Sequence, residues 1–225
     1  MEIKYVINLK NKYYFKLMLR VAHFKNKIEA GIDEAGRGPL LGRVYAAAVI
    51  LNPDMEYDGK LIKDSKKLSS KKILESEQYV KDVAIDWAVA YSDETRIDDI
   101  NILHATQEAM HKAIDQLNVR PDHLLVDGNY FSPYKKVNSM CVVKGDSTYF
   151  SIAAASILAK TARDRYIQEL CIKSPDLDNF YGIKSNKGYG SKGHMDGIKR
   201  FGISKYHRKT FGICKISKLN KLIKY

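Results

Sequence analysis

The 225-residue sequence predicts an α/β fold in which helices pack against a mixed β-sheet, followed by a small helical C-terminal part. Three observations predict it. Short, apolar, β-branched runs indicate strands, and two longer segments repeat apolar residues at helical spacing. These elements follow one another in the order strand, strand, strand, helix, strand, strand, helix. Hydrophobic residues make up 45% of the chain, which suits the packed core of one ordinary domain.

The first elements form a predicted hairpin. Residues 29–34 are a short apolar run that stops at the loop 36–39, Gly-Arg-Gly-Pro, and residues 44–51 are a longer β-branched run. We expect two buried strands joined by this glycine-bearing loop. A third strand is expected at residues 83–90.

The next elements are a helix and two strands. Apolar residues at helical spacing predict a helix over 98–117, with Asp98 or Asp99 at its N-cap. Buried strands are expected at 123–127 and at 140–143, because each apolar run is followed by a glycine within two residues.

The last part of the chain predicts a long helix and then smaller elements. Ser147 is expected to cap an alanine-rich helix over 148–171. We divide the chain into an N-terminal extension (1–28), which is non-catalytic and a candidate for poor order, a catalytic domain (29–183) and a basic helical substrate-binding part (184–225).

Charge is distributed unevenly along the chain, whose net charge is +12. Residues 184–225 contain twelve Lys or Arg against the single acid Asp196, and residues 1–28 contain seven against Glu2, so the stretch between carries −5. An acidic centre between basic ends indicates a cation site beside surfaces that bind a polyanion. The alternative is that the lysines only keep the surface soluble.

The three cysteines, Cys141, Cys171 and Cys214, are odd in number and form no C-x-x-C pair. A disulfide framework or zinc knuckle needs a different pattern, so we expect a reducing, cytoplasmic location. No apolar run approaches the roughly 18 residues of a membrane span, and we expect no membrane association.

Acidic residues stand at the ends of three predicted strands. Asp33 and Glu34 end the first, Asp127 ends the fourth, and Asp146 lies just past the fifth. Strand carboxyl ends form the ligand crevice of open α/β sheets, and clustered acids repel one another unless cations intervene. Oxygen ligands suit Mg²⁺ or Mn²⁺, and two such ions roughly 3.5–4 Å apart can activate water for phosphodiester hydrolysis. Taken singly, Asp127 and Asp146 could instead cap turns.

Asp164 is a second candidate for the fourth acid. Eighteen residues separate it from Asp146. That is about 27 Å along a continuous helix at roughly 1.5 Å per residue, so both cannot line one metal site. We expect Asp146, beside Lys144, to be the ligand. Asp164 stands between Arg163 and Arg165 and is better explained as an ion-pair partner.

Several short motifs follow one another along the chain: Ala30-Gly-Ile-Asp-Glu-Ala-Gly-Arg-Gly-Pro39, Asp64-Ser-Lys-Lys-Leu68, Val126-Asp-Gly128, Lys144-Gly-Asp146, Ile152-Ala-Ala-Ala-Ser-Ile157, Ala159-Lys160 and Gly188-Tyr-Gly-Ser-Lys192. In this order they resemble bacterial ribonuclease HII, over residues 29 to about 211. Each motif alone is weak, and the specific signal is their shared order.

The resemblance implies a ribonuclease H-like fold and a two-metal nuclease site. It implies that four acids are catalytic and bind two divalent cations, Mn²⁺ or Mg²⁺: Asp33, Glu34, Asp127 and Asp146. It implies that Gly36, Arg37 and Gly38 contact the ribose 2′-hydroxyl and the following nucleotide at an RNA–DNA junction. Tyr189 would stack on the sugar past the junction, the alternative being a buried loop aromatic.

The basic tail is expected to hold the duplex. Lys205, Arg208 and Lys209 are predicted to contact backbone phosphates. His194 and His207 are interpreted as phosphate contacts or surface groups, since they have no zinc-ligand partners at the usual spacing.

The expected function is an endoribonuclease that cleaves the RNA strand of RNA–DNA hybrids. It would also cut 5′ of single ribonucleotides in duplex DNA, leaving 3′-hydroxyl and 5′-phosphate ends, and would act as a monomer. The alternatives are a non-catalytic nucleic-acid-binding protein with relic acids and a metal-dependent phosphatase. A phosphatase would need neither Arg37 in a loop nor the basic tail.

Two features bear on the resemblance itself. The related ribonuclease HIII carries a different loop after its Asp-Glu pair, so the Gly-Arg-Gly loop argues against that family. Arg43 and Leu41 stand where we expect proline and alanine. Both lie in or near the substrate loop and could change substrate preference, although drift is the simpler explanation.

Overall fold

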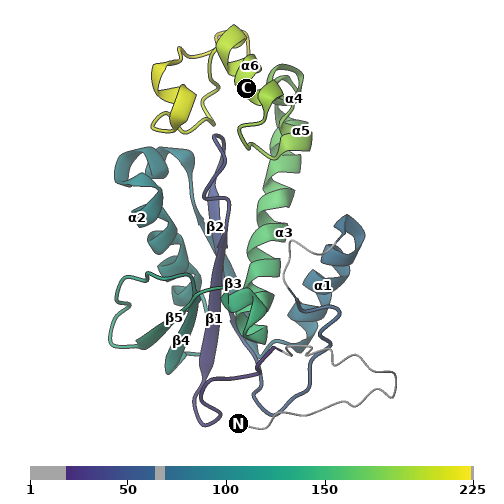
Figure 1. Ribbon diagram of the computed structural model, residues 1–225, viewed down its shortest axis with the longest axis vertical. Coiled ribbons are helices and arrows are strands. Elements are labelled where there is room, and N and C mark those ends of the chain that lie inside the picture. Colours follow the sequence, from purple (N-terminus) through teal and green to yellow (C-terminus); the bar gives the residue numbers. More distant parts are fainter. Residues whose placement is uncertain (1–18, 64–68, 224–225) are drawn as a thin grey trace, which may run out of the picture.

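The centre of the protein is a five-stranded mixed sheet, shown in Figure 1 by a computed structural model that describes residues 19–63 and 69–223. The strand order is β3-β2-β1-β4-β5. β2 pairs antiparallel with both β1 and β3, whereas β4 pairs parallel with both β1 and β5. The strands are β1 (Glu29–Ala35), β2 (Val44–Ile50), β3 (Asp86–Ser92), β4 (His123–Asp127) and β5 (Asn138–Val142).

Helices cover both faces of this sheet (Figure 1). α2 packs on one face, and α3 and α1 pack on the other. Smaller helices gather around the C-terminal end of α3. The helices are α1 (Ser70–Val83), α2 (Glu94–Asp115), α3 (Phe150–Lys173), α4 (Asp176–Tyr181), α5 (Ile183–Asn186) and α6 (Lys192–Phe201), with 3-10 turns η2 (Gly145–Ser147) and η3 (Gly212–Ile216).

Small residues in the central strands let both helical layers approach closely. Along β2, Ala46 and Ala48 join the core under α2, whereas Ala47 joins the core under α3. A Cβ on Gly31 of β1 would lie 2.2 Å from the backbone of Ser151 in α3. Glycine is therefore required there, because protein interiors are already close-packed.

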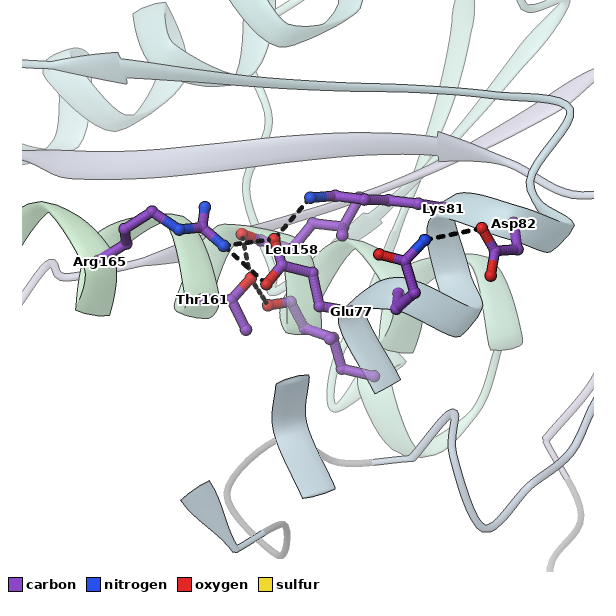
Figure 2. Close-up of polar contacts among 8 residues, drawn as sticks. Glu77, Lys81, Asp82, Leu158, Thr161 and Arg165 are labelled. Atoms are coloured by element: carbon purple, nitrogen blue, oxygen red, sulfur yellow. Dashed lines mark hydrogen bonds and ion pairs between the residues drawn. The ribbon is translucent and has the colours of Figure 1, made fainter. Parts of the chain in front are cut away.

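α1, which the sequence pattern did not predict, is tied to α3 by an ion pair between Glu77 and Arg165 (Figure 2). The Glu77 carboxylate on α1 accepts hydrogen bonds from Arg165 of α3 at 2.8 and 2.9 Å and from Lys81 at 2.7 Å. Arg165 therefore extends toward α1 and is engaged there. Attraction to the two cations outweighs the effect of burial and lowers the pKa of Glu77.

The predicted strands and long helices are present, with errors at several of their ends, and β5, which was predicted to be buried, is instead mostly exposed. β3 begins at Asp86, because α1 continues to residue 83. α2 begins at Glu94, with Asp93 as N-cap, whose side chain accepts a hydrogen bond from the Arg96 backbone at 2.8 Å. Asp98 lies inside α2 and instead accepts hydrogen bonds from the backbone of residues 209 and 210.

The start of α3 also differs from the prediction. Ser147 lies in the 3-10 turn η2, and Tyr149 is the N-cap residue of the helix. α2 is kinked at Asn101, which has φ 65°, and the Asn101 side chain accepts a hydrogen bond from the Leu103 backbone at 2.9 Å. This amide caps the second half of α2, a role that apolar periodicity does not reveal.

Residues 19–28, which the sequence assigned to an extension, lie against the domain. The Arg20 backbone exchanges hydrogen bonds with Thr148 and Phe150, at 2.7 and 2.9 Å. The Glu29 carboxylate accepts a hydrogen bond from the His23 backbone at 2.7 Å. These residues are therefore part of the folded unit.

The C-terminal part shares an apolar core with the rest of the chain. Ile198 of α6 packs in one cluster with Tyr181 of α4, Ile167 of α3 and Leu41 of the β1–β2 loop. Residues on both sides of position 183 therefore contribute to this core, which places the C-terminal part beside the β1–β2 loop. Among the described residues, no helix is both long and apolar enough to cross a membrane.

Candidate active site

A pocket of about 490 Å³ lies where β1 and β4 end, against the side of α3. Three of the four predicted acids line it: Asp33, Glu34 and Asp127. Parallel pairing of β1 with β4 explains this, because the last register pair is Ile32 with Val126 and the acids follow on both strands. Its other lining residues are Ala35, Gly36, Ser156, Lys160, Arg163, Asp164, Lys187 and Tyr189.

Asp33 is buried, Glu34 is partly buried, and their two carboxylates repel one another. Burial raises the pKa of Asp33 well above its usual value, and the nearby charges of Glu34 and Asp127 raise it further, against a hydrogen bond from Ser156. Burial also raises the pKa of Glu34, and Arg37, whose Nη1 lies 3.3 Å from the Glu34 carboxylate, opposes that shift. Buried like charges are costly without a counter-cation, so this site favours cation binding.

Asp33 and Glu34 are neighbours on a strand, yet both line the pocket. The Asp33 side chain accepts a hydrogen bond from the Glu34 backbone at 2.7 Å, and the chain turns at Gly36, which has φ 93°. The predicted turn at Gly36 is therefore present. A Cβ on Gly36 would lie 2.3 Å from Nε of Arg163, so glycine is also needed for space.

Asp127 and Asp146 are connected through Gly145. The Gly145 backbone donates to the Asp127 carboxylate at 2.7 Å, and Asp146 follows in the 3-10 turn η2. Asp146 is only 8% exposed and does not line the pocket. The structure therefore places the predicted fourth ligand beside the pocket wall, next to the backbone that orients Asp127.

Asp164 does line the pocket, unlike Asp146. It forms the ion pair expected of it, although the partner is Lys160 one helical turn earlier, at 3.2 Å. The flanking arginines are engaged elsewhere, because Arg163 donates to the Lys187 carbonyl at 2.7 Å and Arg165 bonds Glu77.

The donor set suits hard divalent cations. The carboxylate oxygens of Asp33, Glu34 and Asp127 are the ligands that Mg²⁺ and Mn²⁺ prefer, and the pocket holds neither cysteine nor histidine. Within residues 19–63 and 69–223, no three His, Cys, Asp or Glu side chains already converge on one point as ligands. Complete coordination would therefore include substrate oxygens or water, as is common for Mg²⁺.

The glycine loop (36–39) lies beside Tyr189, and Gly36 and Tyr189 both line the pocket. A Cβ on Gly38 would lie 3.5 Å from the Tyr189 ring, and the Leu40 backbone donates to the Gly188 carbonyl at 2.8 Å. Tyr189 is 51% exposed, so it is not a buried loop aromatic. Arg37 is also half exposed, and its guanidinium can reach a ligand.

Two predictions about the basic tail are wrong. Arg208 has no exposed surface, and its guanidinium donates to backbone carbonyls of the β1–β2 loop, so it cannot contact a phosphate. His194 and His207 are also fully buried and hydrogen-bond each other at 2.9 Å, so they are not surface groups. Lys205 and Lys209 are exposed, and their phosphate contacts stay a prediction.

Sequence reasoning also missed residues that shape the pocket. Ser156 and Lys160 come from the Ile152–Lys160 stretch of α3, which was noted as a motif without any role for its polar members. The unexpected Arg43 packs over the rings of Tyr91 and Tyr166, at 3.9 and 4.5 Å from their centroids. It therefore lies among aromatic side chains and does not line the pocket.

The Asp64–Leu68 motif lies outside the described residues, so the resemblance is tested on the rest of the chain. The family model for Ribonuclease HII matches residues 30–214. The ribonuclease HII of Parabacteroides distasonis is 52% identical over 185 residues, which cover 82% of this chain and 90% of that relative. The ribonuclease HII of Bacteroides thetaiotaomicron is 48% identical over 196 residues, 87% and 95% of the two chains.

Solved structures show the same fold. The crystal structure of ribonuclease H2 from Pyrococcus horikoshii OT3 superposes with a TM-score of 0.66 at 25% identity, covering 84% of this chain and 95% of that chain. RNase HIII from Bst in complex with Mn²⁺ has a TM-score of 0.53 at 18% identity over 70% of this chain and 56% of that chain, and shows the fold alone. This chain therefore belongs to the ribonuclease HII family and is a metal-dependent endonuclease that acts on RNA–DNA hybrids.

Proposed function

We propose that this enzyme also cuts 5′ of single ribonucleotides embedded in duplex DNA, leaving 3′-hydroxyl and 5′-phosphate ends, by two-metal-ion hydrolysis. The observation that carries the proposal is that one pocket is lined by acids and also by a glycine loop that lies beside an exposed tyrosine. Asp33, Glu34 and Asp127 are the acids of this lining, to which Gly36 and Tyr189 also contribute. Phosphodiester chemistry and sugar recognition would thus occur within one site.

The four acids are proposed to hold Mg²⁺ or Mn²⁺. Asp33, Glu34 and Asp127 face the pocket, and Asp146 would complete the set from the η2 turn beside Asp127. When bound, the two cations supply activation of water and neutralisation of charge on the scissile phosphate. Lys160 also lines the pocket, where it pairs with Asp164. Its ammonium group would therefore lie near the phosphate of a bound substrate.

Recognition of a ribonucleotide requires contact with its 2′-hydroxyl, the group that separates RNA from DNA. Gly36 and Gly38 carry no Cβ, so their backbone groups can approach a ribose closely. The exposed Tyr189 ring, packed beside Gly38, offers a flat surface for the following sugar. That surface favours a deoxyribose, which presents no hydroxyl to the ring.

Two exposed lysines of the C-terminal part would bind the duplex outside the pocket. Lys205 and Lys209 are exposed on the segment that joins α6 to η3. We propose that both bind backbone phosphates, and that the enzyme works as a monomer in the cytoplasm.

One cleavage experiment tests this function. A DNA duplex that contains one ribonucleotide is labelled at its 5′ end and incubated with Mg²⁺, Mn²⁺ or EDTA. We expect one cut 5′ of the ribonucleotide with either metal, a product with a 3′-hydroxyl, and no cut in EDTA. An all-DNA duplex of the same sequence is the matched control. Binding without cleavage in both metals would refute incision at single ribonucleotides.

A further inference from the structure

Arg208 is a buried cation with no acid among its hydrogen-bond partners. Its side chain has no exposed surface. Burial and the nearby Arg163 lower the pKa of Arg208 to about 9, so it stays charged at neutral pH. All five hydrogen bonds of its side chain run to carbonyls of the β1–β2 loop, on Gly36, Arg37, Pro39, Gly42 and Arg43.

This arrangement constrains the shape of the loop. A guanidinium presents its donors in one rigid plane, so five carbonyls that bond to it must hold a fixed arrangement around that plane. A lysine in the same place has three donors on one nitrogen and cannot span the carbonyls of Gly36 and Gly42 together. The bonded carbonyls include those of Gly36 and Arg37, which belong to the proposed ribose contact.

His207, the residue before Arg208, is connected to Tyr189 through His194. His194 Nδ1 lies 2.9 Å from the Tyr189 carbonyl, which only accepts, so this nitrogen carries the proton. His194 Nε2 therefore accepts from His207 Nε2 at 2.9 Å. His207 Nδ1 then accepts from the Ser204 backbone at 2.9 Å, and every ring nitrogen has a partner with both rings neutral.

Backbone bonds join these two anchors. The Arg208 backbone donates to the Leu40 carbonyl at 2.8 Å, and the Leu40 backbone donates to the Gly188 carbonyl at 2.8 Å. A Cβ on Gly188 would lie 2.9 Å from the Leu41 carbonyl, so the two loops touch here. One short segment is therefore hydrogen-bonded to both loops: His207 through His194 to the Tyr189 loop, and Arg208 directly to the glycine loop.

We propose that Arg208 and the His207–His194 pair are positioning residues that fix the gap between the glycine loop and Tyr189, and thereby set selectivity for a single ribonucleotide in DNA. The proposal rests on the proposed function of that gap. The proposed metal-binding acids are not among the hydrogen-bond partners of Arg208, His194 or His207. Cleavage of a long RNA–DNA hybrid, which offers a ribose at every position, therefore depends less on the gap than cleavage at one junction.

The test compares Arg208→Lys with Arg200→Lys. Arg200 is an exposed arginine of α6, so the control makes the same chemical change outside the anchor. We measure kcat and KM on a duplex with one ribonucleotide and on a long hybrid. Misplacement of a positioning group by an ångström can cost about 100-fold. For Arg208→Lys we expect kcat/KM to fall by about 100-fold on the single ribonucleotide and by under about 10-fold on the hybrid. Arg200→Lys should change neither.

A double-mutant comparison separates positioning from general damage. In a Tyr189→Ala background, His194→Phe should cause no further change in the ratio of the two activities, because the ring that the His207–His194 pair positions is gone. His194→Phe removes the hydrogen bond to the Tyr189 carbonyl while keeping an aromatic ring beside Tyr181. It should lower the same ratio, and it carries the test if Arg208→Lys does not fold.

The outcomes are distinct. A wild-type enzyme that cuts the hybrid and leaves the single ribonucleotide uncut would defeat the proposed function. A wild-type enzyme that cuts both, with variants that lose both activities equally, would defeat only the positioning role. Failure of both variants to fold would also overturn it, since the anchor would then serve global stability.

Discussion

Replacing Asp127 by asparagine should abolish cleavage and at the same time stabilise the metal-free protein. The Gly145 N–H donates to the Asp127 carboxylate at 2.7 Å, and the amide oxygen of asparagine can accept the same hydrogen bond. The end of β4 should therefore keep its shape. The substitution removes one of the charges that raise the pKa values of Asp33 and Glu34. Relief of this repulsion should raise the free energy of unfolding at pH 7 of the metal-free protein, and like charges in a partly buried site repel by on the order of 1 kcal/mol or more.

The activity of the same variant should move in the opposite direction. Loss of one charge-stabilising group commonly costs on the order of 100–1000-fold in kcat, and we expect at least that on hybrid substrate. Mn²⁺ at 100 times its Kd should stabilise the wild type by about 2.7 kcal/mol, and Asp127→Asn should lose most of this shift. Thermal melting with and without Mn²⁺, together with cleavage assays, measures both effects.

Asp164→Asn is the comparison within the same pocket. It breaks only the half-exposed pair with Lys160, which is worth at most about 1 kcal/mol, and the variant should still cut. Near-normal turnover by Asp127→Asn would remove Asp127 from the metal site. Loss of cutting by a folded Asp164→Asn would instead make Asp164, which lines the pocket, the fourth acid.

Three further predictions follow from the same geometry. Tyr189→Ala should lose far more activity on a single ribonucleotide than on a long hybrid, and Tyr189→Phe should keep most of it; equal losses on both substrates would refute the stacking role. Gln at Lys205 and Lys209 should weaken binding to any duplex and reduce the slope of log K against log salt by about 2, since each phosphate contact contributes about 0.9; an unchanged slope would make both lysines bystanders. Burial and His194 lower the pKa of His207 to about 3, below the unfolded value of 6.5, so its contribution to stability is present above pH 6.5 and is lost as the pH falls. Denaturant titrations should show about 2 kcal/mol less stability from this group at pH 5 than at pH 8, and a His207→Phe variant should lack that part of the pH dependence.

The strands and the acidic site could be read from the sequence because both rest on local signals. β1, β2 and β4 are short apolar runs bounded by glycine, and their pattern survives whatever packs around them. Asp33 and Asp127 each follow such a run, and strand carboxyl ends of parallel neighbours meet at one edge. The long alanine-rich helix was equally plain, and only its first residues were misplaced.

α1 was missed because its apolar side is too weak to stand out. Only a few of its residues, such as Ile73 and Val80, pack against α3, and its attachment depends on Glu77 meeting Arg165 from 88 positions away. An ion pair between distant segments has no sequence period. Asp164 lines the pocket and Asp146 does not, and this placement likewise follows from the direction in which α3 crosses the sheet, which no local pattern encodes.

The basic tail shows the limit most clearly. Its sequence determined how much positive charge the segment carries, and Lys205, Arg208 and Lys209 are equal in that count. Only the tertiary structure decided that Lys205 and Lys209 are exposed to solvent whereas Arg208 is buried. Arg208 is surrounded by carbonyls of a loop that lies up to 172 residues earlier in the chain. The physical reason is that a buried cation is tolerated only where fixed dipoles replace its hydration, and those dipoles come from whichever backbone the fold brings beside it.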